Sequence, residues 1–168
     1  GEAIFGAAPV AIGTDQLSID QLETGLIAGK ILSYAQGFAM INAASSDYDW
    51  ALPLPKIARV WRAGCIIRSS MLDDMATALT RNPDRNLMQA PAFADLLKAH
   101  HMALRQIVAV GTLHGIAMPA LASSIAYFDA MRTSRGTANM IQGQRDYFGR
   151  HSFSRLDGGV GCHGPWAE

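Results

Sequence analysis

The sequence predicts an all-α, bundle-like fold that ends in an extended C-terminal tail. Apolar residues recur at helical spacing through several long stretches, start and stop signals border those stretches, and none of them alternates as a strand would. With 168 residues and 49% hydrophobic content, the chain can bury one core. We therefore expect a helical domain over residues 1–152 and an extended tail over residues 153–168.

The N-terminal part predicts two helices of very different length. Residues 1–14 are small and weakly patterned, so we expect a partial helix and then a mobile connection at residues 6–13. Ser18 and Gln21 can form a capping box, which opens a long helix that ends near Ala44. The apolar positions of this helix are Leu22, Leu26, Ile31, Tyr34, Phe38 and Ile41.

Small residues form a ridge along the same long helix, at Gly25, Gly29, Ser33 and Gly37. Glycine costs a helix about 0.5–1 kcal/mol relative to alanine, so this small-residue ridge needs a packing reason. The ridge predicts that another helix backbone approaches closely, either within one subunit or at a subunit interface.

The next stretch predicts a second long helix, which Pro55 opens and which runs past Leu79. Two arginines on it, Arg62 and Arg68, could bind an anion. Arginines on such a helix more often pair with carboxylates such as Asp73, and we favour that interpretation.

Two further helices are opened by prolines, at Pro91 and at Pro119. The first should end at His114–Gly115 and the second should run through Met131. The adjacent pair His100–His101 points to different sides of its helix and cannot make a facing pair of ligands, so we expect no metal site.

Charge and cysteine content argue against several classes of partner. The formal net charge is zero, and a nucleic-acid surface needs clustered basic charge, so we expect no nucleic-acid partner. Cys65 and Cys162 are too few for a disulfide framework, which favours a reducing, cytoplasmic setting. No apolar run approaches the roughly 18 residues of a membrane span, so we expect no membrane partner.

The segment Gln142–Phe153 carries the densest set of functional side chains. Thr137 can cap a short helix, and Gly149 stands where a left-handed helix end is expected. Arg145 offers a planar fork of N–H donors, and His151 offers a ring N–H whose charge changes near neutral pH. Together Arg145 and His151 could hold a phosphate monoester.

The glycine-rich stretch that follows carries one large apolar side chain, Trp166, which is costly to leave in water. Glycine-rich chain has little to pack on itself. We therefore expect this tail to dock on another part of the assembly.

Five blocks stand in order along the chain: Lys30–Phe38, Trp61–Ser69, Ala138–Gln142, Gln144–His151 and His163–Trp166. Together they resemble the decarboxylating 6-phosphogluconate dehydrogenases. The resemblance implies the C-terminal helical domain of an enzyme that oxidises 6-phosphogluconate with NADP, releases carbon dioxide and gives ribulose 5-phosphate. It also implies a homodimer in which Arg145 and His151 bind the substrate phosphate and the tail reaches the other subunit.

In this family the lysine and glutamate that transfer protons precede the matched region, so we expect no catalytic residue in this chain. No Gly-x-Gly-x-x-Gly turn follows a strand here, so NADP should be bound mainly by an absent N-terminal domain and not by these residues. The choice between NADP and NAD would lie with that domain. We expect a fragment that has no dehydrogenase activity alone.

Two alternatives remain on the residues themselves. Family members carry a phosphate-binding arginine where Ala7 stands, so either the alignment shifts there or one ligand is lost. From residue types alone, the chain could also be a non-catalytic helical dimerisation module, in which Arg145 caps a helix and His151 lies on the surface.

Overall fold

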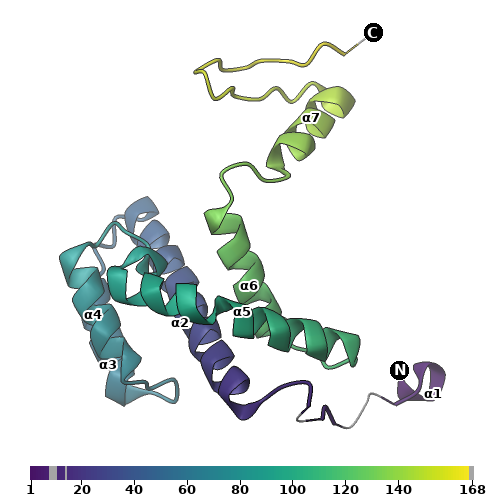
Figure 1. Cartoon of the computed structure of the whole chain (residues 1–168). Helices are drawn as coiled ribbons and strands as arrows, with labels where there is room; N and C mark the ends of the chain where they lie inside the picture. The colour runs from purple at the N-terminus through teal and green to yellow at the C-terminus, as the bar shows by residue number, and fades with distance from the viewer. Residues whose placement is uncertain (8–10, 14, 167–168) are drawn as a thin grey trace. The chain divides into compact units, whose positions relative to one another are not determined.

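A computed structural model describes residues 1–7, 11–13 and 15–166 of the protein, and these residues form an all-α fold (Figure 1). Their helices are α1 (Glu2–Phe5), α2 (Ile19–Asp47), α3 (Leu54–Gly64), α4 (Met71–Arg81), the 3-10 helix η1 (Leu87–Gln89), α5 (Pro91–Leu113), α6 (Pro119–Arg132) and α7 (Ala138–Gly149). The predicted fold class is confirmed. Residues 8–10 of the expected connection and 167–168 of the expected tail lie outside the described residues.

The chain divides into two compact units, Gly1–Phe128 and Asp129–Glu168. The second unit holds α7 together with the tail, because hydrogen bonds join them. The boundary that we expected between residues 152 and 153 therefore falls inside this second unit.

The core of the first unit lies between α2 and α5, which pack along each other. The 3-10 helix η1 contacts α2, α4 and α5, and α3 packs against α4. Burying one large apolar side chain, such as that of Leu, Ile, Phe or Met, stabilises the fold by about 1.5–3 kcal/mol. The largest fully buried apolar side chains are Ile31, Leu32, Phe38, Leu72, Met75, Phe93, Leu97 and Leu104.

The small-residue ridge of α2 is used within the first unit. A Cβ added at Gly25 would lie 3.1 Å from the main-chain nitrogen of Leu104, so the backbone of α5 occupies the space that a side chain would need. A Cβ at Gly29 would lie 2.7 Å from Cδ2 of Leu121, whereas one at Gly37 would meet nothing within 4 Å. The predicted close approach of a helix backbone is confirmed within one subunit at Gly25, whereas at Gly29 the neighbouring atoms belong to side chains.

The prediction of one long helix from Pro55 past Leu79 is wrong. The chain forms two helices there, because α3 ends at Gly64 and α4 begins at Met71. Cys65 has extended backbone, with φ −150° and ψ 171°. Glycine at position 64 weakens the helix locally, and the hydroxyl of Tyr34 donates a hydrogen bond to the carbonyl of Ile67 at 2.7 Å. This bond satisfies a carbonyl that the helix would otherwise have used.

Two local predictions from side-chain chemistry are confirmed. The hydroxyl of Ser18 accepts from the N–H of Gln21 at 3.1 Å, and the Gln21 side chain accepts from the N–H of Ser18 at 2.8 Å, which completes the capping box. Arg62 Nε donates to Asp73 Oδ2 at 2.7 Å, so this arginine pairs with a carboxylate. Both partners are solvent-exposed, and such a pair is worth about 0.2–1 kcal/mol.

Candidate functional site

The two predicted phosphate ligands, Arg145 and His151, line the same open pocket of the second unit. Arg145 lies on α7 and His151 lies just beyond the C-terminal end of this helix. The pocket has a volume of about 370 Å³. Its lining consists of Ile141, Gln144, Arg145, Phe148, Gly149 and His151.

Both side chains have donors to offer to a ligand. The exposed guanidinium of Arg145 makes, among the described residues, one hydrogen bond, to Oε1 of Gln142 at 3.4 Å. This long contact joins two side chains, so Arg145 does not cap the carbonyls at the end of α7. The imidazole of His151 is also exposed and has no hydrogen bond to any residue that the structure describes. A planar fork of N–H groups and a ring N–H therefore share one pocket.

The end of α7 differs from the prediction at Gly149. Gly149 is the last helical residue, and the left-handed residue is Arg150, with φ 49° and ψ 41°. A Cβ added at Gly149 would lie 2.9 Å from Nε2 of His151, so the imidazole lies in the space that a side chain at position 149 would use. At the other end Thr137 precedes α7, but its own backbone is helical and its side chain makes no capping bond.

A buried carboxylate that the sequence analysis missed lies next to Arg145 in the chain. Asp146 has no exposed surface, although its neighbours on α7 are exposed. Its carboxylate accepts hydrogen bonds from Ser152 N at 2.9 Å, His163 Nδ1 at 2.6 Å, Gly164 N at 2.8 Å and Trp166 Nε1 at 2.7 Å. An ionised carboxylate only accepts, so Nδ1 of His163 carries the proton in this contact.

The environment of Asp146 favours its ionised form. Burial alone raises the pKa of this carboxyl group. The hydrogen bonds from Gly164, Trp166, His163 and Ser152 outweigh burial and hold the pKa of Asp146 well below its usual range. A fixed negative charge therefore joins the tail to α7.

The tail returns to α7 of its own chain. The N–H and carbonyl groups of Phe153 and Cys162 pair in both directions, at 2.9 and 3.0 Å, which makes an isolated antiparallel bridge. The ring of Trp166 lies edge-on to Tyr147, with centroids 5.7 Å apart. Asp146 therefore supplies a buried acceptor on which the tail packs within its own chain. Docking of the tail on a partner subunit stays a prediction.

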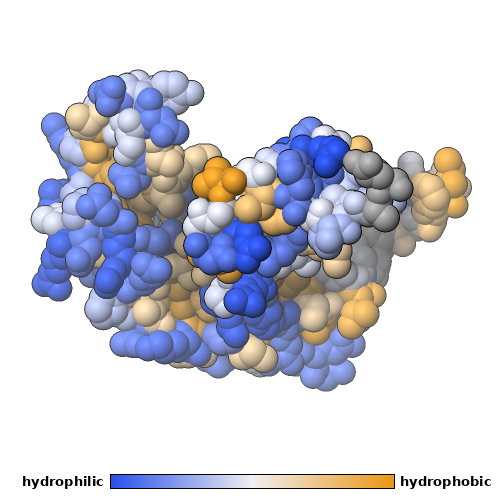
Figure 2. All heavy atoms as spheres, turned by 90° about the horizontal axis from the view of Figure 1, so that it is seen from above, coloured by the Kyte–Doolittle hydropathy of each residue, from blue (hydrophilic) through white to orange (hydrophobic). Residues whose placement is uncertain are grey.

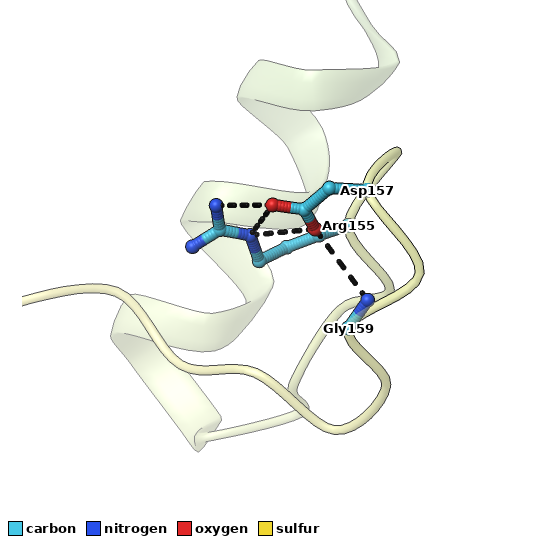
Figure 3. Close-up of polar contacts among 3 residues, drawn as sticks. All are labelled: Arg155, Asp157 and Gly159. Carbon is cyan, nitrogen blue, oxygen red and sulfur yellow. Dashed lines mark hydrogen bonds and ion pairs between the residues drawn. The ribbon is translucent and has the colours of Figure 1, made fainter.

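A clamp of Arg155 and Asp157 closes the turn of the tail (Figure 3). Arg155 Nε donates to the two carboxylate oxygens at 3.0 and 3.1 Å, and Nη2 donates to Oδ2 at 2.5 Å. The guanidinium of Arg155 lowers the pKa of Asp157, and the N–H of Gly159 adds a weaker contact at 3.5 Å. Arg155 is therefore engaged within the tail and is a poor candidate for an anion ligand.

Other kinds of site find no support in the residues that the structure describes. Within these ranges, no three His, Cys, Asp or Glu side chains are grouped so that they could hold a metal ion. No helix of the described chain combines the length and the apolar character that crossing a membrane requires.

Known proteins resemble this chain over nearly its whole length. The family model "6-phosphogluconate dehydrogenase, C-terminal domain" matches residues 5–166. A protein of Shigella flexneri named "6-phosphogluconate dehydrogenase, decarboxylating" is 42% identical over 168 residues, which are 99% of this chain and 36% of that protein. A Bacillus subtilis protein named "6-phosphogluconate dehydrogenase, NAD(+)-dependent, decarboxylating" is 42% identical over 151 residues, or 89% of this chain and 32% of its own length.

A solved structure has the same fold. The 6-phosphogluconate dehydrogenase of Plasmodium falciparum, described in its apo form, with its cofactor NADP+ and with its substrate 6-phosphogluconate, matches with a TM-score of 0.88 and 35% identity. The match covers 98% of this chain and 36% of that one, so the chain spans about a third of the length of these relatives. The motif-based resemblance is thereby confirmed, and the chain belongs to the 6-phosphogluconate dehydrogenase C-terminal domain family.

Proposed function

We propose that this chain supplies substrate-phosphate ligands and the dimer interface of a decarboxylating 6-phosphogluconate dehydrogenase. The complete enzyme oxidises 6-phosphogluconate with NADP and releases carbon dioxide, which gives ribulose 5-phosphate in the cytoplasmic pentose phosphate pathway. The names of the relatives support this reaction, and the Plasmodium falciparum protein binds both NADP+ and 6-phosphogluconate. The Bacillus subtilis relative is NAD(+)-dependent, whereas the cofactor of the Plasmodium falciparum protein is NADP+, and NADP is the cofactor that we propose for this enzyme.

The shared pocket of Arg145 and His151 carries the proposal, because it gathers donors suited to a phosphate monoester. Two guanidinium N–H groups can meet two phosphate oxygens in parallel, and the imidazole can donate to another. A charge-assisted hydrogen bond of this kind contributes roughly 1.5–3 kcal/mol. The role of these residues is to hold the phosphate end of the sugar, and no proton transfer is assigned to them.

The described residues do not fit a dinucleotide cofactor. Dinucleotide sites form on a glycine-rich turn between a strand and a helix. The described part of this chain contains an isolated bridge and no named strand. NADP is therefore assigned to another part of the complete enzyme.

A homodimer is proposed because α7 exposes large apolar side chains. Their exposed fractions are 72% for Met140, 53% for Ile141, 60% for Tyr147 and 80% for Phe148. Hydrophobic residues are visible among polar ones on the face that Figure 2 shows. Apolar surface of this kind marks a site of association, and a two-fold dimer is the commonest assembly. In this arrangement the pocket of Arg145 completes a substrate site that lies mainly on the other subunit.

A crystal of the complete enzyme soaked in 6-phosphogluconate tests the proposed function. We expect the phosphate at hydrogen-bond distance, about 3 Å, from the guanidinium of Arg145 and the imidazole of His151. Bound sugar whose phosphate contacts neither residue would contradict the proposal. It would leave the non-catalytic dimerisation module as the better description of this domain.

A further inference from the structure

Asp146 holds the main chain on both sides of His151. Its carbonyl accepts a hydrogen bond from the N–H of Arg150 at 2.8 Å, and its side-chain Oδ1 accepts one from the N–H of Ser152 at 2.9 Å. One residue of α7 therefore fixes the chain immediately before and immediately after a proposed phosphate ligand.

The two residues that flank His151 adopt backbone conformations that are rare for residues with side chains. The φ angle is 49° at Arg150 and 60° at Ser152. Such conformations persist where surrounding contacts determine them. The hydrogen bonds to Asp146 are contacts of this kind, so the place of His151 depends on Asp146.

The carboxylate of Asp146 cannot itself reach a substrate. Its side chain has no exposed surface, and both oxygens are occupied, Oδ1 by Ser152 and His163 and Oδ2 by Gly164 and Trp166. Any effect of this residue on the pocket must therefore pass through the residues that it holds.

We propose that Asp146 is a positioning residue of the phosphate site, an inference that rests on the proposed role of Arg145 and His151 as ligands. By docking the tail on α7, Asp146 keeps the imidazole of His151 against Gly149, on the lining of the pocket. Arg145 belongs to α7 itself, so its place on the lining does not require the tail. Asp146 is therefore coupled to His151 and not to Arg145.

Because Asp146 is coupled to His151, a role in positioning His151 can be distinguished from a general effect of Asp146 on the stability of the domain. If Asp146 acts through His151, removing the carboxylate from a protein that already lacks His151 changes substrate binding little further. If Asp146 only stabilises the domain, its effect adds to that of His151. A double-mutant cycle measures the difference directly.

The experiment compares four variants of the complete enzyme: Asp146→Asn, His151→Ala, the double variant of these two, and Arg145→Ala. Asn keeps the size of Asp but offers one oxygen acceptor in place of two, so it cannot serve both pairs of donors. We expect Asp146→Asn to raise KM for 6-phosphogluconate about fivefold with kcat within about twofold. The double variant should have a KM within about twofold of His151→Ala alone.

Hydrogen exchange on the chain itself gives a readout that does not depend on activity. In Asp146→Asn the amides of Ser152 and Gly164 lose their acceptor or share one, so we expect them to exchange about tenfold faster or more. Amides at the centre of α7 should change less than these two.

The outcomes distinguish the inference from the proposed function. If Arg145→Ala raises KM while Asp146→Asn leaves KM unchanged, or while Asp146→Asn and His151→Ala act additively, the positioning role is overturned and the proposed function stands. If Arg145→Ala and His151→Ala both leave KM unchanged, the proposed function is overturned and the inference with it.

A second variant serves if Asp146→Asn does not fold. Trp166→Phe keeps the carboxylate and an aromatic ring and removes one of the four donors. We expect faster exchange at Gly164 and a KM for 6-phosphogluconate raised by about twofold. An unchanged KM with unchanged exchange at Gly164 would overturn the inference.

Discussion

The indole Nε1 of Trp166 donates a hydrogen bond to Oδ2 of Asp146 across 2.7 Å. The two partners are 20 positions apart in the sequence, so this bond closes the tail onto the helix that carries Arg145. The tryptophan that would be costly to expose thus finds a polar partner inside its own chain. The geometry of the pocket and the docking of the tail are consequently two aspects of one arrangement.

Arg145→Ala should weaken substrate binding selectively. In the complete enzyme we expect KM for 6-phosphogluconate to rise about tenfold or more, because roughly 1.4 kcal/mol of lost binding is a factor of ten. KM for NADP should change little. Steady-state kinetics check this, with Arg135→Ala as the matched control, since Arg135 is an exposed arginine between α6 and α7 that does not line the pocket. An equal rise in KM for the Arg135→Ala control would show that the effect comes from the loss of one positive charge and not from the position of Arg145.

Mixed dimers should recover activity if two subunits share each substrate site. One inactive variant lacks Arg145 and the other lacks the upstream catalytic lysine that the family resemblance implies. A mixed dimer then contains one site with an intact lysine from the first chain and an intact Arg145 from the second. Activity measured after proven subunit exchange checks this, and persistent inactivity would mean that each subunit completes its own site.

Removing the chain after Asp157 should weaken the dimer. The deletion takes away His163, Gly164 and Trp166, and so leaves the buried carboxylate of Asp146 with one of its four donors. Loss of these partners removes the contacts that hold the tail on α7, and exposes the face of α7 that the tail covers. Sedimentation across a concentration series should show a larger dissociation constant than for the intact chain. An unchanged constant would mean that the tail takes no part in association.

The docking of the tail should survive mild acid. The pKa of Asp146 is lowered from its ordinary value of 3.8, so the stability that it contributes is fully present above that value. It is lost progressively as pH falls below 3.8 toward the lowered pKa, while His163 is the titratable group that faces the carboxylate. The NMR signals of the Trp166 indole and the Gly164 amide should therefore stay unchanged from pH 7 to about 4.5. Their loss near pH 5 would contradict an ionised anchor.

Two glycines of the small-residue ridge should respond in opposite directions to the same change. Gly25→Ala places a Cβ 3.1 Å from the main chain of α5, so we expect the free energy of unfolding to fall by about 1–3 kcal/mol. Gly37→Ala meets nothing within 4 Å, so the better helix propensity of alanine should raise it by about 0.5–1 kcal/mol. Urea unfolding at one fixed protein concentration checks both, since association contributes to the measured stability. Equal effects at the two positions would contradict the packing of α2.

Local chemistry made much of this fold predictable. The capping box at Ser18 and the prolines that open α5 and α6 specify where helices begin, because their effect depends on residues within one turn. That Arg145 and His151 lie near one another was predictable for the same reason, since both lie within one short segment around the end of α7 and line one pocket.

Features that depend on distant residues were not predictable in this way. The break at Cys65 is supported by the hydroxyl of Tyr34, which belongs to another helix. Asp146 resembles any charged residue on the exposed face of a helix, because its donors follow it by six to twenty residues in a tail with no periodic pattern. Only the folded tail shows that this charge is buried and satisfied.

The clamp of Arg155 and Asp157 bears on the order in which the assembly forms. Arg155 and Asp157 are two positions apart, so closing the clamp orders very little chain. We expect it to close as fast as a β-hairpin forms, which takes about 1–10 μs. The turn is then already shaped when two subunits of the proposed dimer meet, a step that takes milliseconds or longer. A preformed tail loses less conformational entropy on docking than a random one, by about 0.5–1.5 kcal/mol for each side chain that is already held. Breaking the clamp should therefore weaken the proposed dimer, because the tail would then lose more conformational entropy on docking.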